Sequence, residues 1–222
     1  MSARPRIGSR LRPDLPFRYI SGDPALDLVN TVDWTRDGPN DERLTDYERF
    51  TEFAHDAGVI DGEIAERLRH TAAREPYAAA QALDRVLIVR DALQRVVEFA
   101  TAPGPRRGRQ HTRALGELND ALRSALAHLQ LRDAGGGLAL EWVGLGESLE
   151  SPLWPLIWSA AQLLASEEHH RLRVCAGPDC GWVYVDRSRN RMRRWCQMET
   201  CGNRAKASRR YSRVRQRNTR SS

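Results

Sequence analysis

The sequence predicts an α+β fold, in which a mainly helical N-terminal domain with a small sheet precedes a much smaller cysteine-rich module. Apolar residues recur at helical spacing along most of the chain before residue 165. A short alternating stretch at 138–143 follows three consecutive glycines and predicts a strand. All four cysteines lie between residues 175 and 201. A segment of about fifty residues buries too little apolar surface to fold alone, so its cysteines are expected to hold it together.

The first third of the chain contains three patterns that predict the start of a helix. Asp23 can cap a helix in which Pro24 takes the first helical position. Thr45 stands three residues before Glu48, which is the spacing of a capping box and predicts a second helix. Asp61 can cap a third helix. The polar stretch at 35–43 is expected to be a loop.

Three further helices complete the predicted body. Pro76 opens a long helix, whose inward face is expected to be Leu83, Val86, Leu87, Val89, Leu93, Val96 and Val97. The next helix has apolar residues at steps of three and four, namely Leu115, Leu118, Leu122, Leu126 and Leu129. Ser151 and Pro152 start the last one, with an inward face of Leu153, Leu156, Ile157, Ala160 and Leu164.

The charges of the chain divide it in two. Residues 1–170 carry 20 basic and 26 acidic side chains, whereas residues 171–222 carry 15 basic and 3 acidic ones. A net charge of −6 in the first part and +12 in the second favours a polyanion-binding module attached to an ordinary body. We therefore predict four segments: a flexible arm at 1–16, the body at 17–168, the module at 171–217 and a disordered tail at 218–222.

The cysteines form two matched pairs. Four residues separate Cys175 from Cys180 and also Cys196 from Cys201, and fifteen residues separate the pairs. Four thiolates in two short pairs suit a closed tetrahedral site, so we predict one structural Zn²⁺ ion held by all four. The gap is wider than the commonest ribbon spacing of two. A thiol redox switch and a pair of disulfides are the alternatives, and the Arg- and Pro-rich N-terminus lacks the apolar core of a signal peptide, which disfavours disulfides.

The module is expected to resemble a treble clef. Residues 172–174 and 182–185 predict a hairpin, with Gly177 and Pro178 turning the chain inside the first cysteine pair. A helix is expected from Cys201 to about Arg217, carrying the end of the second pair. Zinc would hold these elements together. Three aromatic residues are expected to form a small core rather than to stack on bases: Trp182, Tyr184 and Trp195.

Two groups of basic residues are predicted to contact nucleic acid. Spacings of four, three and four place one group on a single helical stripe, with Arg209 beside it: Lys206, Arg210, Arg213 and Arg217. The other group precedes Cys196: Arg187, Arg189, Arg191, Arg193 and Arg194. Arg204 can read guanine, contact a phosphate or pair with Asp186. Arginine forks fit guanine in the major groove, and neutralised phosphates make binding salt-dependent, so duplex DNA is the predicted partner and RNA the alternative.

Several polar residues have two interpretations. Four of them either line a ligand pocket or cap and pack a helix end: Asp27, Asn30, Asp33 and Trp34. Asp27 lies between apolar neighbours and needs a hydrogen-bond partner if it is buried. Gly202 would let backbone amides approach a sulfur atom, and Asn203 would cap a helix or bond a knuckle carbonyl. The body has no catalytic motif, so the chain is expected not to be an enzyme.

Two motifs in the chain resemble known families. Arg193-Arg194-Trp195-Cys196, followed by Cys201-Gly202-Asn203-Arg204, resembles the CGNR zinc finger, whose name spells the residues at 201–204. The residues at 186–190 and 206–207 also fit that family. The stretch at 25–31, Ala-Leu-Asp-Leu-Val-Asn-Thr, resembles the signature that opens the ABATE domain, with Leu28 where an aromatic residue is usual. The resemblance implies a bacterial, stress-related regulator of transcription.

These observations together predict a zinc-dependent transcription regulator of the cytoplasm. The finger would bind duplex DNA, while the N-terminal domain would sense a small-molecule effector or form a homodimer. An RNA-binding or ribosome-associated zinc protein is the alternative, and an enzyme or sensor with an accessory finger is a third. The most apolar stretch, Leu153–Ala165, is shorter than the ~20 residues that cross a bilayer, so no membrane partner is expected.

Overall fold

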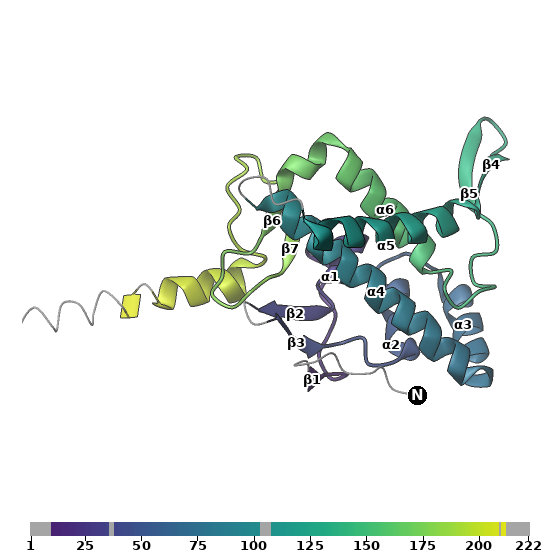
Figure 1. Ribbon diagram of the computed structural model, residues 1–222, viewed down its shortest axis with the longest axis horizontal. Helices are drawn as coiled ribbons and strands as arrows, with labels where there is room; N and C mark the ends of the chain where they lie inside the picture. Colours follow the sequence, from purple (N-terminus) through teal and green to yellow (C-terminus); the bar gives the residue numbers. More distant parts are fainter. Residues whose placement is uncertain (1–9, 36–37, 103–107, 209, 212–222) are drawn as a thin grey trace, which may run out of the picture.

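The computed structural model describes residues 10–35, 38–102, 108–208 and 210–211. Within these residues the body is mainly helical (Figure 1). Its α-helices are α1 (Pro24–Val29), α2 (Tyr47–Asp56), α3 (Gly62–Arg74), α4 (Pro76–Thr101), α5 (Arg109–Leu126) and α6 (Leu153–Ala165). A short 3-10 helix, η1 (Glu167–Arg171), leads into the cysteine-rich module, which is called the finger below. In the part described, no helix is both long and apolar enough to cross a membrane.

Three small sheets accompany these helices. Strand β3 (Gly38–Glu42) pairs in parallel with β1 (Arg10–Leu11) and antiparallel with β2 (Val32–Thr35). The β4–β5 hairpin (Leu129–Asp133 and Leu138–Trp142) projects from the body on the side opposite the finger (Figure 1). The β6–β7 hairpin (Leu172–Val174 and Val183–Val185) is antiparallel and belongs to the finger, as predicted.

Helix α4 is the centre of the body. It packs against α1, α2, α3 and α5, and also against β6 of the finger. All seven apolar residues predicted for its inward face are buried. The same apolar cluster continues without a break into the finger hairpin, where it includes Leu172, Val183 and Val185. The body core and one face of the finger hairpin are therefore one packed unit.

The N-terminal segments differ from the prediction in three places. Arg10 and Leu11 form β1 rather than part of a flexible arm, and Arg10 Nε donates to Asp41 at 3.0 Å. The stretch at 35–43, expected to be a loop, contains β3, because its polar residues pair with β2 instead of packing into a core. Helix α2 is capped by Asp46, which accepts from the Arg49 amide at 2.9 Å, and not by Thr45. The segments at 1–9 and 218–222 lie outside the described residues.

Two inward helical faces also differ from the prediction. Helix α5 buries a face rich in alanine rather than the predicted leucine stripe: Ala114, Leu118, Ala121 and Ala125. Leu115 and Leu126 are partly exposed, and Leu129 begins β4. In α6, Leu163 is buried where Leu164 was predicted to be, and Leu164 is only partly buried. Small alanine side chains let α5 lie close to its neighbours α4 and α6, so the contact face follows size as well as apolar character.

A buried ion pair joins α4 to β3. Arg90 donates from Nη1 to Glu42 Oε1 at 2.8 Å and from Nη2 to Oε2 at 2.6 Å. Both side chains are almost fully buried, at 0% and 3% exposure. Arg90 Nη1 also donates to Thr31 Oγ1 at 2.9 Å, just after α1. This bidentate pair fixes the small sheet against the central helix, and it requires both charges to be present.

We predict that Glu42→Gln lowers the free energy of unfolding by about 3 kcal/mol, because it leaves the Arg90 guanidinium buried without its bidentate partner. Urea unfolding followed by circular dichroism measures this change. The control is Glu48→Gln, which removes an exposed ion pair with Arg69 and is expected to cost no more than about 1 kcal/mol. Equal effects of the two substitutions would contradict the assignment.

Candidate metal centre and its basic surface

The four cysteine side chains converge on one point. Their Sγ atoms all lie within 4.8 Å of one another, and all four are free thiols. The Sγ atoms of Cys180 and Cys196 are 3.8 Å apart, and those of Cys196 and Cys201 are 3.6 Å apart. Four sulfurs bound at about 2.3 Å to one tetrahedral ion lie about 3.8 Å from each other. The thiols therefore fit a closed Zn²⁺ site, and in this structure they are free rather than joined in disulfides.

The backbone brings the first pair of thiols together. Cys175 follows β6, and Cys180 precedes β7, so the hairpin places both at one end. A Cβ atom at Gly177 would lie 3.1 Å from Cys201 Sγ, so a larger residue in this turn would crowd the cysteine cluster. The amides of Gly177 and Cys196 donate to Cys175 Sγ at 3.4 and 3.2 Å. Hydrogen bonds from the Cys180 and Cys196 thiols, together with these amides, hold the pKa of Cys175 far below its usual range.

The second pair is placed by a turn of π-helix, η2 (Met198–Gly202), which contains Cys201. Gly202 does not bring an amide to sulfur as predicted, because its N–H donates to the Gln197 carbonyl at 3.1 Å. A Cβ there would approach Met198 Sδ, which is near the flexible end of an exposed side chain that can move aside. Asn203 Nδ2 donates to the Glu199 carbonyl at 3.1 Å, which agrees with a structural role. A helix follows from residue 203 to 211, with residue 209 outside the described part.

The aromatic residues of the finger form the small core predicted for them. Tyr184 is fully buried and Trp182 is 7% exposed, and both cluster with the cysteines. Trp195 packs against this cluster and is partly buried. Tyr184 Oη donates to the Arg193 carbonyl at 2.8 Å, which ties the second cysteine segment to β7. These rings are therefore committed to the fold of the finger.

The polar residues near α1 hold the finger to the body. Asn30 Nδ2 donates to the Val183 carbonyl, and its Oδ1 accepts from the Val183 amide, both at 2.9 Å. Asp33 Oδ1 accepts from Trp182 Nε1 at 3.0 Å, and the Trp34 carbonyl accepts from the Gly181 amide at 2.7 Å. These three residues of the predicted ligand pocket therefore hydrogen-bond to residues 181–183 of the finger. We call this contact between the body and the finger the seam.

Asp27, the remaining member of that predicted set, binds a turn of the body instead of the hairpin. Its buried carboxylate accepts from the Ile20 and Ser21 amides at 3.0 and 2.9 Å. These are the partners that a buried aspartate requires. Burial raises the pKa of Asp27, although the amides oppose this change. Asp27 fixes the turn before α1 and does not line a pocket together with Asn30.

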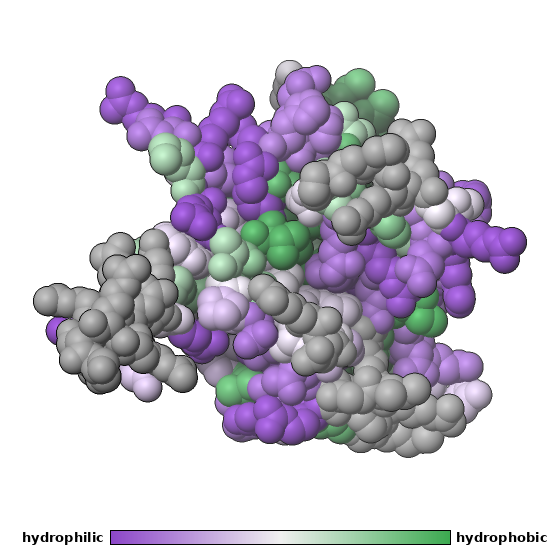
Figure 2. Space-filling view, turned by 60° about the vertical axis from the view of Figure 1, so that its left-hand side comes forward, coloured by the Kyte–Doolittle hydropathy of each residue, from purple (hydrophilic) through white to green (hydrophobic). Residues whose placement is uncertain are grey.

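The basic residues predicted to contact nucleic acid separate into three groups. Those that are exposed and form no ion pair in the described part are Arg189, Arg191, Arg194, Arg204, Lys206 and Arg210. Arg187 pairs with Glu168 through two hydrogen bonds, and Arg193 donates to the Trp195 and Cys196 carbonyls. Those outside the described residues are Arg209, Arg213 and Arg217. Figure 2, which brings the finger side forward, shows hydrophilic residues over much of this face.

A buried carboxylate organises the basic loop before Cys196. Asp186 is fully buried, and its two oxygens accept from the Ser188 amide at 3.0 Å and the Arg193 amide at 3.0 Å. Burial opposes its ionisation, but the hydrogen bonds from Ser188 and Arg193 lower the pKa of Asp186 overall. One carboxylate thus closes both ends of the loop. Arg204, for which Asp186 was one predicted partner, makes no hydrogen bond to it within the described residues.

Two arginines that no sequence pattern marks complete the seam. Arg43 Nη1 donates to Asp33 Oδ1 at 3.0 Å, and its guanidinium lies 5.5 Å from the Trp182 ring centre. Arg18 Nη1 donates to Gln197 Oε1 at 3.1 Å. Both arginines are more than 130 residues away from their finger partners along the chain, so no local signal could have identified these contacts.

Comparison with known families agrees with this geometry. The family model described as "Putative stress-induced transcription regulator", ABATE, matches residues 22–167, and the CGNR zinc finger model matches residues 171–214. No curated protein matches the sequence. The two matches cover the helical body and the four-cysteine module in that order, and the first spans more than half of the chain. The chain therefore belongs to the ABATE family, with a CGNR zinc finger following the ABATE domain.

Proposed function

We propose that this chain is a zinc-dependent regulator of transcription whose finger binds duplex DNA. The body would hold the finger in a fixed orientation, and would sense a small-molecule effector or form a homodimer. The observation that carries the proposal is the set of exposed basic side chains on both sides of the four-cysteine site. They lie on the loop before Cys196 and on the helix after Cys201. A surface of this kind neutralises phosphates, which supplies a large share of the affinity of DNA-binding proteins.

The loop before Cys196 is suited to this role because it is fixed in advance. Asp186 closes the loop at both ends, and Arg191 has a φ of 51°, which turns the tip sharply. The backbone that carries the exposed Arg189 and Arg191 therefore loses little further conformational entropy on binding. A rigid element with arginines at its tip can enter a groove and present guanidinium forks to base edges or phosphates.

Duplex DNA is favoured over single-stranded RNA by the placement of the aromatic rings. RNA-binding modules stack unpaired bases on exposed aromatic side chains. In this finger Tyr184 and Trp182 are buried beside the cysteines, so these rings do not offer such a platform. RNA binding is the competing function, and the experiment below separates the two.

The proposal assigns no catalysis to the chain. Four thiolates leave a tetrahedral zinc ion no open position for water or substrate, so the role assigned to the metal is structural. Bound zinc would join the hairpin and the following helix, which carry separate pairs of ligands. The thiolates, the amide donors at Cys175 and the aromatic core would hold the exposed arginines in place.

Selection from random duplex DNA by the zinc-loaded full chain tests the proposal. We expect one recovered sequence motif at physiological salt, and no motif with Cys196→Ser, because the substitution removes a ligand that joins the two halves of the finger. Metal analysis is expected to give one zinc per chain for the natural protein and much less for the variant. A binding comparison with hairpin RNA accompanies the selection. Salt-sensitive binding without a motif, or tighter binding to the RNA, would contradict the proposal.

The salt dependence of binding identifies the arginines that neutralise phosphates. We predict that the triple substitution of Arg189, Arg191 and Arg194 by Gln makes the salt slope shallower, by roughly one for each phosphate that is no longer neutralised. Fluorescence anisotropy with a labelled duplex at several salt concentrations measures the slope. All three side chains are exposed, so the fold and zinc content should not change.

A matched triple variant on the body is the control for that experiment. Arg74, Arg95 and Arg113 are also exposed, and their substitution by Gln changes the net charge by the same amount. We expect this variant to keep the slope of the natural protein, because these residues lie on α3, α4 and α5. Equal slopes for the two triple variants would show that only the net charge matters.

A further inference from the structure

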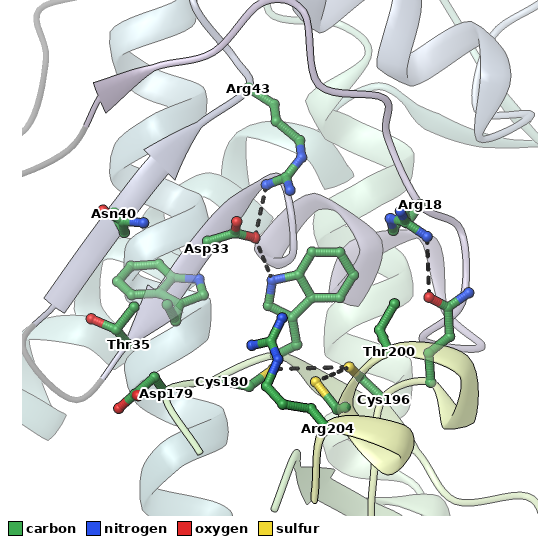
Figure 3. Close-up of a pocket in the computed structure, with 14 residues that line it drawn as sticks. Arg18, Asp33, Thr35, Asn40, Arg43, Asp179, Cys180, Cys196, Thr200 and Arg204 are labelled. Atoms are coloured by element: carbon green, nitrogen blue, oxygen red, sulfur yellow. Dashed lines mark hydrogen bonds and ion pairs between the residues drawn. The ribbon is translucent and has the colours of Figure 1, made fainter. Parts of the chain in front are cut away.

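A cleft of about 400 Å³ lies at the seam between the body and the finger (Figure 3). Strands β2 and β3 and the segment before α1 form one side, with Trp34, Asn40 and Arg18. The finger forms the other side, with Trp182 and Arg204. Its volume is within the range of small-molecule pockets. A ligand in this cleft would touch both units at once.

Three arginines line the cleft, and most of their N–H groups have no partner within the described residues. Arg18 uses Nη1 for Gln197, and Arg43 uses Nη1 for Asp33. Arg43 is 5% exposed, and its Nε is buried without a hydrogen-bond partner. The Arg204 side chain makes no hydrogen bond or ion pair in the described part of the chain. Arg43 Nε is thus a buried donor without a partner, which is rare in folded proteins. The remaining N–H groups of Arg18 and Arg204 are exposed, so they can donate to a ligand with several acceptor atoms.

Part of this positive charge is balanced by the protein itself. Asp33 pairs with Arg43, and a closed zinc tetrathiolate would leave two negative charges beside the cleft. Charge alone therefore does not define the ligand. Trp34, which is partly exposed, also lines the cleft, and its indole ring favours a flat ring. One guanidinium group can donate two parallel hydrogen bonds to two oxygens of a carboxylate or a phosphate.

We propose that this cleft binds a small planar anion, a ring that carries a carboxylate or a phosphate. The ring would lie against the Trp34 indole, and the anionic group would accept from Arg18 and Arg204. Arg204 also belongs to the exposed basic set on the helix after Cys201. An occupied cleft therefore couples a small molecule to the proposed DNA-binding surface; this coupling rests on the proposed function, whereas binding of the ligand itself does not depend on DNA binding.

Isothermal titration of the zinc-loaded full chain, without nucleic acid, tests this site. The probes are AMP, a ring compound with a phosphate group, and benzoate, a ring with a carboxylate group. Adenosine, which lacks the anionic group, and inorganic phosphate, which lacks the ring, are measured beside them. We expect AMP or benzoate to bind at one site with a dissociation constant below about 1 mM, and both adenosine and phosphate to bind at least about tenfold more weakly. The tighter of the two ring anions identifies phosphate or carboxylate as the natural group.

Variants locate the binding to the cleft. Arg18→Gln and Arg204→Gln should each weaken the ring anion about tenfold, since each removes charge-assisted hydrogen bonds. Both residues are exposed, and an unchanged zinc content checks the fold. Arg210→Gln, on the same helix but outside the cleft lining, is the matched control and should leave binding unchanged. The proposal is overturned if neither ring anion binds, if adenosine or phosphate binds equally well, or if Arg204→Gln and Arg210→Gln have equal effects.

Discussion

Strand β7 lies between two apolar clusters, and the arrangement of both units follows from this position. Side chains of a strand alternate between its faces, so Val183 and Val185 point to the body core while Tyr184 points to the cysteines. Asn30 of the body satisfies both backbone groups of Val183. The Ser21 carbonyl accepts from the Val185 amide at 2.8 Å, which extends this contact along the strand. The body thus supplies the edge partner that a two-stranded hairpin lacks.

This contact gives the finger a fixed orientation. Most of the bonds that cross the seam involve at least one backbone group, as in Gly181 to Trp34 and Arg193 to Ile20. Backbone groups occupy defined positions, so they set geometry more strictly than flexible side chains do. The exposed arginines are consequently presented by the whole molecule rather than by a mobile module. The cleft at the seam lies within the same contact, which explains why a ligand there would affect both units.

The sequence predicted those features that depend on local pattern. These features are the α4 face, the caps at Asp23 and Asp61, the finger hairpin and the four-cysteine cluster, and each follows from a pattern within one short segment of the chain. The predicted buried face of α5 was only partly right: Leu118 is buried and Leu122 packs against the core, but close helix packing selected alanines where Leu115 and Leu126 were expected. Strand β3 was missed because it is polar and gains its stability from pairing with β2. The seam could not be predicted, since Asn30 and Val183 are 153 residues apart and nothing local marks their contact.

The most direct test of this account is differential scanning calorimetry of the full chain with zinc bound and after removal of zinc by a chelator. Because the finger hairpin shares the body core, we predict a single cooperative transition that moves to a lower temperature when zinc is removed. A body that packs independently would behave differently. Two separate transitions, of which only the smaller one responds to the chelator, would contradict the shared core.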